Sequence, residues 1–205
     1  TINNSQSISV EVSVLIPKDF DAMDDSLKKS SFNIGTLAVK GDQVNTSTTE
    51  QASTALSLEV KNQIELSKIE LEKEDGTIVD ITSTSNVVVT AEQDLTFTFY
   101  VKNTFANGTF VEMSEVIINM DIEDIDQDDT SFTTLDPGDI DSESLDFNID
   151  EAGNAKVTVL IKGKDEFGGI HGLEKKFTLE INPTPSEPDD TDGDGVTDNN
   201  DSCPR

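Results

Sequence analysis

The sequence predicts an all-β protein built as an antiparallel β-sandwich, and three observations lead to that prediction. Runs in which apolar and polar residues alternate recur along the 205 residues, as expected of strands that bury one face. Threonine and β-branched residues dominate these runs, and Gly, Asn and Asp separate them. No segment carries the pattern of a long helix, which argues against strand–helix alternation.

The N-terminal third holds three alternating runs, at residues 8–14, 32–39 and 56–60. Between the first two, residues 20–30 carry acidic residues near their start and two lysines near their end, which predicts at most one short turn of helix. Residues 69–81 predict a hairpin, because two apolar runs flank Asp75 and Gly76, a pair favoured in tight hairpin turns.

Strands are then predicted as far as residue 181. Four further runs lie at residues 95–101, 116–122, 157–161 and 177–181. Asn107 and Gly108 supply a second turn signal between the first two of these runs. Residues 66–182 therefore hold about as many strands as one immunoglobulin-like sandwich needs. Residues 1–65 form either a small β-rich domain or strands that complete the sheets of that sandwich.

Charge and composition exclude several classes of function. Forty-two acidic and 14 basic residues give a net charge of −28, which repels nucleic acid and disfavours anionic membrane surfaces. No run of about 18 apolar residues occurs, so we expect no transmembrane segment. Cys203 is the only cysteine and closes no disulfide within the chain. The chain starts at Thr1 with neither methionine nor signal peptide, which we expect of a processed or excised fragment.

The sequence offers no recognisable catalytic constellation, and we expect a non-enzyme. His171 is the only histidine, which excludes multi-histidine zinc sites, and its glycine-rich surroundings at 168–172 indicate a turn residue. No phosphate-binding loop is present. With 42 carboxylates, chance acidic pairs leave glycoside hydrolysis open. The lack of tryptophan and the single Tyr100, however, argue against the aromatic platforms of sugar sites.

The composition changes abruptly after residue 182. Three prolines within six residues make residues 183–189 a predicted extended linker. In residues 190–205, aspartates occupy positions 1, 3, 5, 9 and 12 of a twelve-residue loop, with Gly195 at position 6 and a backbone carbonyl at position 7. A calcium-binding loop that wraps around a hard cation supplies its oxygen ligands from these positions. The predicted Ca²⁺ ligands are Asp190, Asp192, Asp194, Val196, Asp198 and Asp201. The alternative interpretation is a solvated acidic linker.

The tail reads Asp-x-Asp-x-Asp-Gly-x-x-Asp-x-x-Asp-x-Cys-Pro over residues 190–204, and it resembles one unit of the thrombospondin type 3 repeat. The resemblance implies a secreted protein, calcium bound by the five aspartates, and repeats strung into a calcium-stiffened array. It also implies that Cys203 pairs with a cysteine elsewhere in a longer chain. Neighbouring repeats in this family often share ligands, so a lone unit implies weak binding.

A second resemblance lies just before the linker. Residues 154–183 contain Val-Thr-Val, then Asp165-Glu-Phe-Gly-Gly169, then Phe177-Thr-Leu-Glu-Ile-Asn-Pro. They look like the closing strands of bacterial cadherin-like and immunoglobulin-like adhesin repeats. This resemblance implies an extracellular sandwich that is used in tandem as a stalk or adhesive module, and it identifies no ligand.

A second acidic cluster follows the run at 116–122. Its members are Asp121, Glu123, Asp124, Asp126, Asp128 and Asp129. A loop rich in carboxylates at one end of a sandwich is a candidate second Ca²⁺ site, to which Asp139 or Asp141 would add a ligand. The alternative interpretation is an exposed loop whose charge keeps a strand edge soluble.

Together these observations predict a non-catalytic, calcium-binding extracellular module of a secreted bacterial surface protein, acting as a structural spacer or in cell adhesion. Its expected partners are calcium ions and other cell-surface proteins or glycans. The alternative is an accessory, non-catalytic region of a secreted hydrolase, such as a protease or a polysaccharide-degrading enzyme. A third class, a ligand-binding sandwich, would need a concave pocket.

Overall fold

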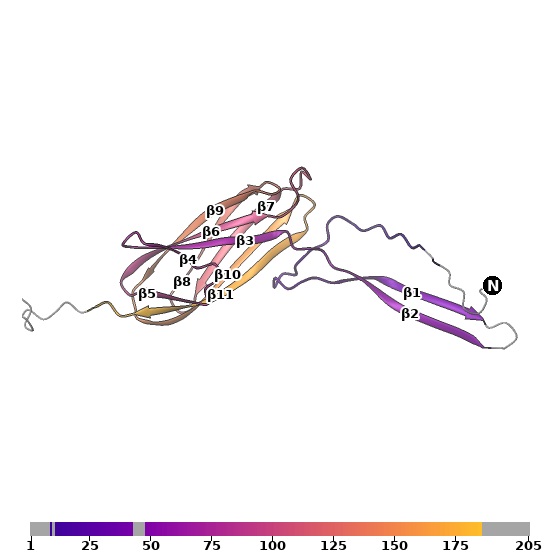
Figure 1. Cartoon of the computed structure of the whole chain (residues 1–205), viewed down its shortest axis with the longest axis horizontal. Helices are drawn as coiled ribbons and strands as arrows, with labels where there is room; N and C mark the ends of the chain where they lie inside the picture. Colours follow the sequence, from indigo (N-terminus) through magenta and orange to yellow (C-terminus); the bar gives the residue numbers. More distant parts are fainter. Residues whose placement is uncertain (1–8, 10, 43–47, 186–205) are drawn as a thin grey trace, which may run out of the picture.

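The computed structural model describes residues 9, 11–42 and 48–185, and this part of the chain is all-β (Figure 1). Its eleven strands form a two-stranded, a four-stranded and a five-stranded sheet. The two larger sheets bury one shared apolar core and make a sandwich. The prediction of an all-β chain is confirmed, and the strand pairing is antiparallel apart from one pair described below.

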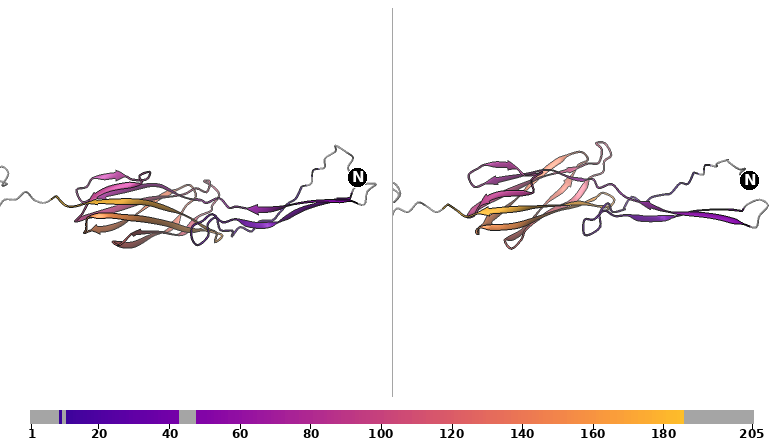
Figure 2. Two further views of the ribbon diagram at one scale, coloured as in Figure 1. Left: turned by 90° about the horizontal axis from the view of Figure 1, so that it is seen from below. Right: turned by 60° about the horizontal axis from the view of Figure 1, so that its bottom comes forward.

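The two-stranded sheet is a long hairpin that projects from one end of the sandwich (Figures 1 and 2). Strand β1 (Phe32–Asp42) pairs with β2 (Thr49–Leu58) in antiparallel register, with one irregularity between Asn33 and Gly35. Among the described residues neither strand joins a sheet of the sandwich. The division of the chain at residue 65 stays a prediction.

Two expectations for the N-terminal segment are wrong. The described part of the run at 8–14 forms no strand, and Val12 and Val14 are exposed. Alternation predicts a strand only where a second strand is available to pair, and none of the described strands pairs with this run. Residues 20–30 form no helix but a tight turn closed by a bridge between Met23 and Lys29. The Asp24 carboxylate accepts bonds from the amides of residues 26 and 28, in competition with helical bonding.

The four-stranded sheet has the order β4-β3-β6-β9. Its strands are β3 (Ile64–Lys73), β4 (Ile78–Asp80), β6 (Gln93–Asn103) and β9 (Ile140–Ile149). The hairpin predicted at Asp75 and Gly76 is present between β3 and β4. Gly76 has a φ of 78°, a left-handed conformation that favours glycine, and its amide donates to the Lys73 carbonyl at 2.8 Å.

The five-stranded sheet has the order β5-β11-β10-β7-β8. Its strands are β5 (Asn86–Thr90), β7 (Met113–Ile122), β8 (Asp126–Leu135), β10 (Gly153–Asp165) and β11 (Ile170–Asn182). All its pairings are antiparallel except that of β5 with β11, which is parallel. This parallel pair departs from the purely antiparallel prediction. It arises because the chain crosses from β4 to the other sheet and continues beside β11 instead of turning back.

The core is built from the alternating positions that the sequence marks. In β6, Leu95, Phe97, Phe99 and Val101 are fully buried while the residues between them are not. The Phe97 ring packs 6.0 Å from that of Phe147 in β9 and 6.3 Å from that of Phe177 in the opposite sheet. Burial of each such ring contributes about 2 to 3 kcal/mol, so this contact helps to hold the two sheets together.

The chain enters and leaves the sandwich at opposite ends. Ile64, where β3 begins, pairs with Asn103, whereas Ile181 near the end of β11 pairs with Gly153 at the far end. Figure 2 shows the β1–β2 hairpin at one end and the C-terminal exit at the other. We call these the hairpin end and the exit end. The full length of the sandwich therefore separates the N-terminal hairpin from the point where the chain leaves β11.

Candidate functional site

The predicted calcium ligands of the tail, Asp190, Asp192, Asp194, Val196, Asp198 and Asp201, lie outside the described residues. That site stays a prediction. The described chain continues just past β11, where the Thr184 hydroxyl donates to the Ala91 carbonyl at 3.0 Å and lies 3.2 Å from Glu92 Oε2. The first residues of the predicted linker are thus tied to the exit end of the sandwich.

The second acidic cluster lies at the turn between β7 and β8, also at the exit end. Strand alternation divides it, because cross-strand partners share a face. Asp126 and Asp128 lie opposite the buried Ile122 and Met120, whereas Asp129 lies opposite Asn119 on the other face. Among the described residues, no group of three or more His, Cys, Asp or Glu side chains is placed to hold a metal ion.

Of the remaining carboxylates, Asp121 pairs opposite Gln127, on the same face as Asp129. Glu123 forms an ion pair with Lys156 at 2.9 Å. The carbonyl of Asp139 accepts a bond from the Asn103 amide at the hairpin end, and Asp141 pairs opposite Val101 nearby. These two aspartates therefore lie at the wrong end of the sandwich to complete a site at the β7–β8 turn. The charges of β8, an edge strand, fit the alternative interpretation of edge protection.

Two of the three buried polar residues in the described chain, Asp165 and His171, contact each other at the hairpin end. His171 is the second residue of β11 and is fully buried, so its assignment to a turn is wrong. Its Nδ1 accepts a hydrogen bond from the Gln63 amide at 3.1 Å, and its Nε2 lies 3.3 Å from Asp165 Oδ2. Since Nδ1 accepts, Nε2 carries the proton and donates to the carboxylate.

Electrostatics favour the neutral form of this imidazole. Burial lowers the pKa of His171 below 6.5, although the Asp165 carboxylate and, more weakly, Asp21 act in the opposite direction. The other Asp165 oxygen accepts bonds from the amides of Phe167 at 2.9 Å and Gly169 at 2.8 Å. Asp165 therefore has two roles: one carboxylate oxygen closes the turn between β10 and β11, and the other orients the His171 imidazole.

The backbone on either side of His171 binds the two chain segments that flank the hairpin. The Asp21 carboxylate accepts from the Ile170 amide at 2.9 Å, and the Asn62 side chain accepts from the Gly172 amide at 3.0 Å. The Ala22 amide also donates to the Ile170 carbonyl at 2.9 Å. We call Asp21, Asn62, Gln63, Asp165 and His171 the junction. Its polar groups bond to one another and to nearby backbone, so it fixes the hairpin to the sandwich.

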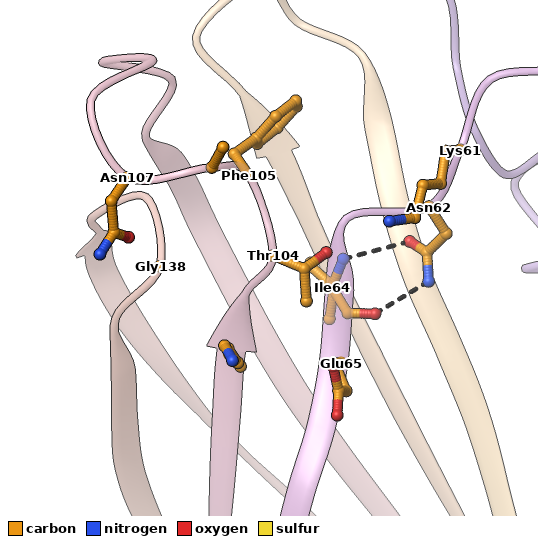
Figure 3. A pocket seen from close by; sticks show the side chains of 10 residues that line it. Lys61, Asn62, Ile64, Glu65, Thr104, Phe105, Asn107 and Gly138 are labelled. Carbon is orange, nitrogen blue, oxygen red and sulfur yellow. Dashed lines mark hydrogen bonds between the residues drawn. The ribbon is translucent and has the colours of Figure 1, made fainter.

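A polar hollow of about 590 Å³ lies beside the junction (Figure 3). Lys61, Asn62, Glu65, Thr104, Phe105 and Asn107 contribute to its lining. Its polar groups are partly engaged within the chain. The Asn62 amide nitrogen donates to the Ile64 carbonyl at 2.9 Å, and the Thr104 hydroxyl donates to the Gln63 side chain at 2.7 Å. The described lining holds no nucleophile hydrogen-bonded to a base.

Sequence reasoning missed the junction because its members come from three distant segments. The nearest signal was the spacing of Asp165 and His171 on either side of Gly168 and Gly169. In an antiparallel hairpin that spacing brings the two side chains together, and Lys164 indeed pairs with Ile170. The contacts of Asp21 and Gln63 have no comparable signal, because they depend on how the N-terminal segments return to the sandwich.

Comparisons with known proteins give little further. No protein-family model matches the chain, and no curated protein matches it. Among solved structures, the C-terminal domain of wzt is 12% identical with a TM-score of 0.41, and the match covers 62% of this chain and 77% of that one. Spo0M, a sporulation control protein from Bacillus subtilis, is 11% identical with a TM-score of 0.28, over 56% of this chain and half of that one. Neither similarity is close enough to support an argument.

No helix in the described part of the chain is long and apolar enough to cross a membrane.

Proposed function

We propose that this chain is a non-catalytic extracellular module of a secreted bacterial surface protein, in which an immunoglobulin-like or cadherin-like sandwich acts as a spacer or in adhesion and the tail binds calcium. The observation that carries the proposal is the placement of the two connections. The hairpin joins the sandwich at one end and β11 delivers the chain to the acidic tail at the other. A spacer requires this arrangement, because each module must add its full length.

The chemistry of the described residues agrees with a non-catalytic role. The buried histidine is engaged on both ring nitrogens, and the described lining of the hollow beside it lacks a nucleophile paired with a base. The surface is strongly acidic, which suits a protein that is surrounded by cations. A hydrolase accessory region would share these properties and would differ in what adjoins the chain.

The tail supplies the calcium chemistry of the proposal. Five aspartates with the spacing of a cation-wrapping loop begin five residues after Pro185, the last described residue. Asp201 stands where a loop of high affinity has a bidentate glutamate, so the expected dissociation constant is on the order of 10⁻⁴ to 10⁻³ M, as in other extracellular modules. Calcium bound along the tail would stiffen the spacer beyond its exit end.

Calcium titration calorimetry in chelator-treated buffer tests the proposal on the whole chain and on a version that ends at Pro185. We expect the whole chain to bind Ca²⁺ and the shortened version to lose that binding. The double variant Asp192→Asn/Asp194→Asn removes two predicted ligands and should behave like the shortened version. The matched control, Asp126→Asn/Asp128→Asn, removes the same charge from the β7–β8 turn and should bind like the wild type.

Two results would contradict this proposal. Equal binding by the whole and the shortened chain would place the calcium site in the sandwich, and loss of binding in the Asp126→Asn/Asp128→Asn variant would then assign it to the second acidic cluster. No binding by any version at millimolar Ca²⁺ would show that the tail of this chain is a solvated acidic linker.

A further inference from the structure

The β1–β2 hairpin is amphipathic, and the large apolar side chains of one face are exposed. Cross-strand pairing puts Leu37 opposite Thr54 and Val39 opposite Ala52, which places these four residues on one face. The opposite face carries Thr36, Ala38, Lys40, Gln51, Ser53 and Ala55, and none of these is a large apolar residue. Leu37 is 41% exposed and Val39 63% exposed, although β-branched and aliphatic side chains at alternate positions are typical of a buried strand face.

The hairpin also lacks support from its own chain. A two-stranded sheet is at best marginally stable in water unless another layer packs on it. Among the described residues β1 and β2 pair only with each other, so both outer edges are open. These edges are ten and eleven residues long and contain no proline, and the one irregularity lies near the base at Asn33. Proline and charged residues, two common devices that protect an exposed edge, are thus missing over residues 36–39 and 51–58.

The local charge distinguishes the hairpin from the rest of the molecule. Its strands contain one lysine, Lys40, against two acidic residues, Asp42 and Glu50, a net charge of −1. The whole chain carries −28. Two copies of so acidic a protein repel each other over most of their surface, and the repulsion is weak where the hairpins meet. The hairpin also projects well away from the acidic sandwich (Figure 2).

We propose that the apolar face of the hairpin is a self-association surface that packs against the same face of a second copy of this chain. Two twisted ribbons stacked about 10 Å apart would form a small two-layer sandwich with Leu37 and Val39 of both copies at its centre. Such an interface is isologous, since the same patch serves both partners. The contact is independent of the calcium tail, which leaves from the opposite end.

The exposed segment at residues 11–16 adds apolar surface at the same end of the molecule (Figure 1). Val12, Val14, Leu15 and Ile16 are all exposed, and the segment has the alternation of a strand without a described strand partner. Pairing of this segment with its own hairpin, without a second copy, is the competing arrangement.

Sedimentation velocity across a wide concentration range, in chelator, tests the proposal with two double variants of β1. Leu37→Lys/Val39→Lys places two charges on the apolar face. The matched control, Thr36→Lys/Ala38→Lys, adds the same charge to the opposite face of the same strand. We expect the wild type to dimerise as its concentration rises, the first variant to dimerise at least tenfold more weakly, and the control to stay within about threefold of the wild type.

Other outcomes would overturn the proposal. A wild type that stays monomeric at every soluble concentration would show that no second copy covers the face. Equal weakening by both variants would assign self-association to another surface or to edge pairing. Hydrogen exchange that protects residues 11–16 and 37–39 independently of concentration would favour pairing within one chain. Urea unfolding of each variant establishes that the sandwich stays folded.

Discussion

The single buried histidine makes the pH dependence of stability a sharp test of the junction. Burial lowers the pKa of His171 below 6.5 in the folded protein, while Asp165 and Asp21 oppose the shift. The unfolded chain exposes the imidazole and binds a proton near its ordinary pKa. Folding therefore releases this proton in the window between the two values, and stability falls as the pH decreases through about 6.5.

The size of the effect follows from one proton. Between the unfolded-state pKa and the lowered folded-state pKa, the free energy of unfolding decreases by up to about 1.4 kcal/mol for each pH unit. Below the folded-state pKa both states are protonated and the decrease stops. Protonation at Nδ1 also converts the acceptor of the Gln63 amide into a donor, so the hydrogen bond that holds the β3 segment to β11 is lost.

Urea unfolding at pH 7.5, 6.5 and 5.5 measures this contribution when the wild type is compared with His171→Gln. The carboxylates and the chain termini are common to both proteins, so the difference in slope isolates the imidazole. We expect the wild type to lose stability relative to the variant as the pH falls. Because the chain has one histidine, its NMR signal reports the folded-state pKa directly. Parallel slopes, or titration of His171 at or above 6.5, would refute the reasoning.

Two further predictions concern stability. Gly172→Ala should lower the free energy of unfolding by about 1 to 3 kcal/mol, because the added methyl would overlap the Ile161 carbonyl oxygen and crowd Leu27. In the control, Gly153→Ala, the added methyl meets no atom within 4 Å, so the free energy of unfolding should change little. Asn103→Ala should cost about 2 to 4 kcal/mol in urea unfolding, because the buried side chain bonds the Val111 and Leu135 carbonyls and the Phe105 amide. A cost below about 1 kcal/mol would show that water replaces these bonds.

Periodicity predicted the sandwich well because each strand there has a partner and a common core. The run from Leu95 to Val101 is buried at alternate positions because β3 and β9 flank it and the other sheet covers it. The turn at Asp75 and Gly76 was predictable because left-handed backbone there needs glycine. These are local rules, and a single sequence contains them.

The same periodicity failed where the partner is missing. Val12 and Val14 alternate as well as any strand, yet none of the described strands lies in place to accept their backbone hydrogen bonds. The parallel pairing of β5 with β11 was likewise not predictable, since it depends on where the chain crosses between sheets. The junction was not predictable for a third reason, because Asp21, Gln63 and His171 come together only after the whole chain has folded.

The strands that carry the chain into and out of the sandwich bear on the proposed spacer role. β3 starts at the hairpin end and β11 finishes at the exit end, so a pull between hairpin and tail acts along the length of both strands. β11 is paired with β10 over twelve residue pairs and with β5 at its exit end. In the antiparallel β10–β11 pair the hydrogen bonds are perpendicular to the strands, so such a pull loads them together in shear and they cannot open one after another. A module whose termini left the same end would be unzipped pair by pair, which is the weaker arrangement for a protein under tension.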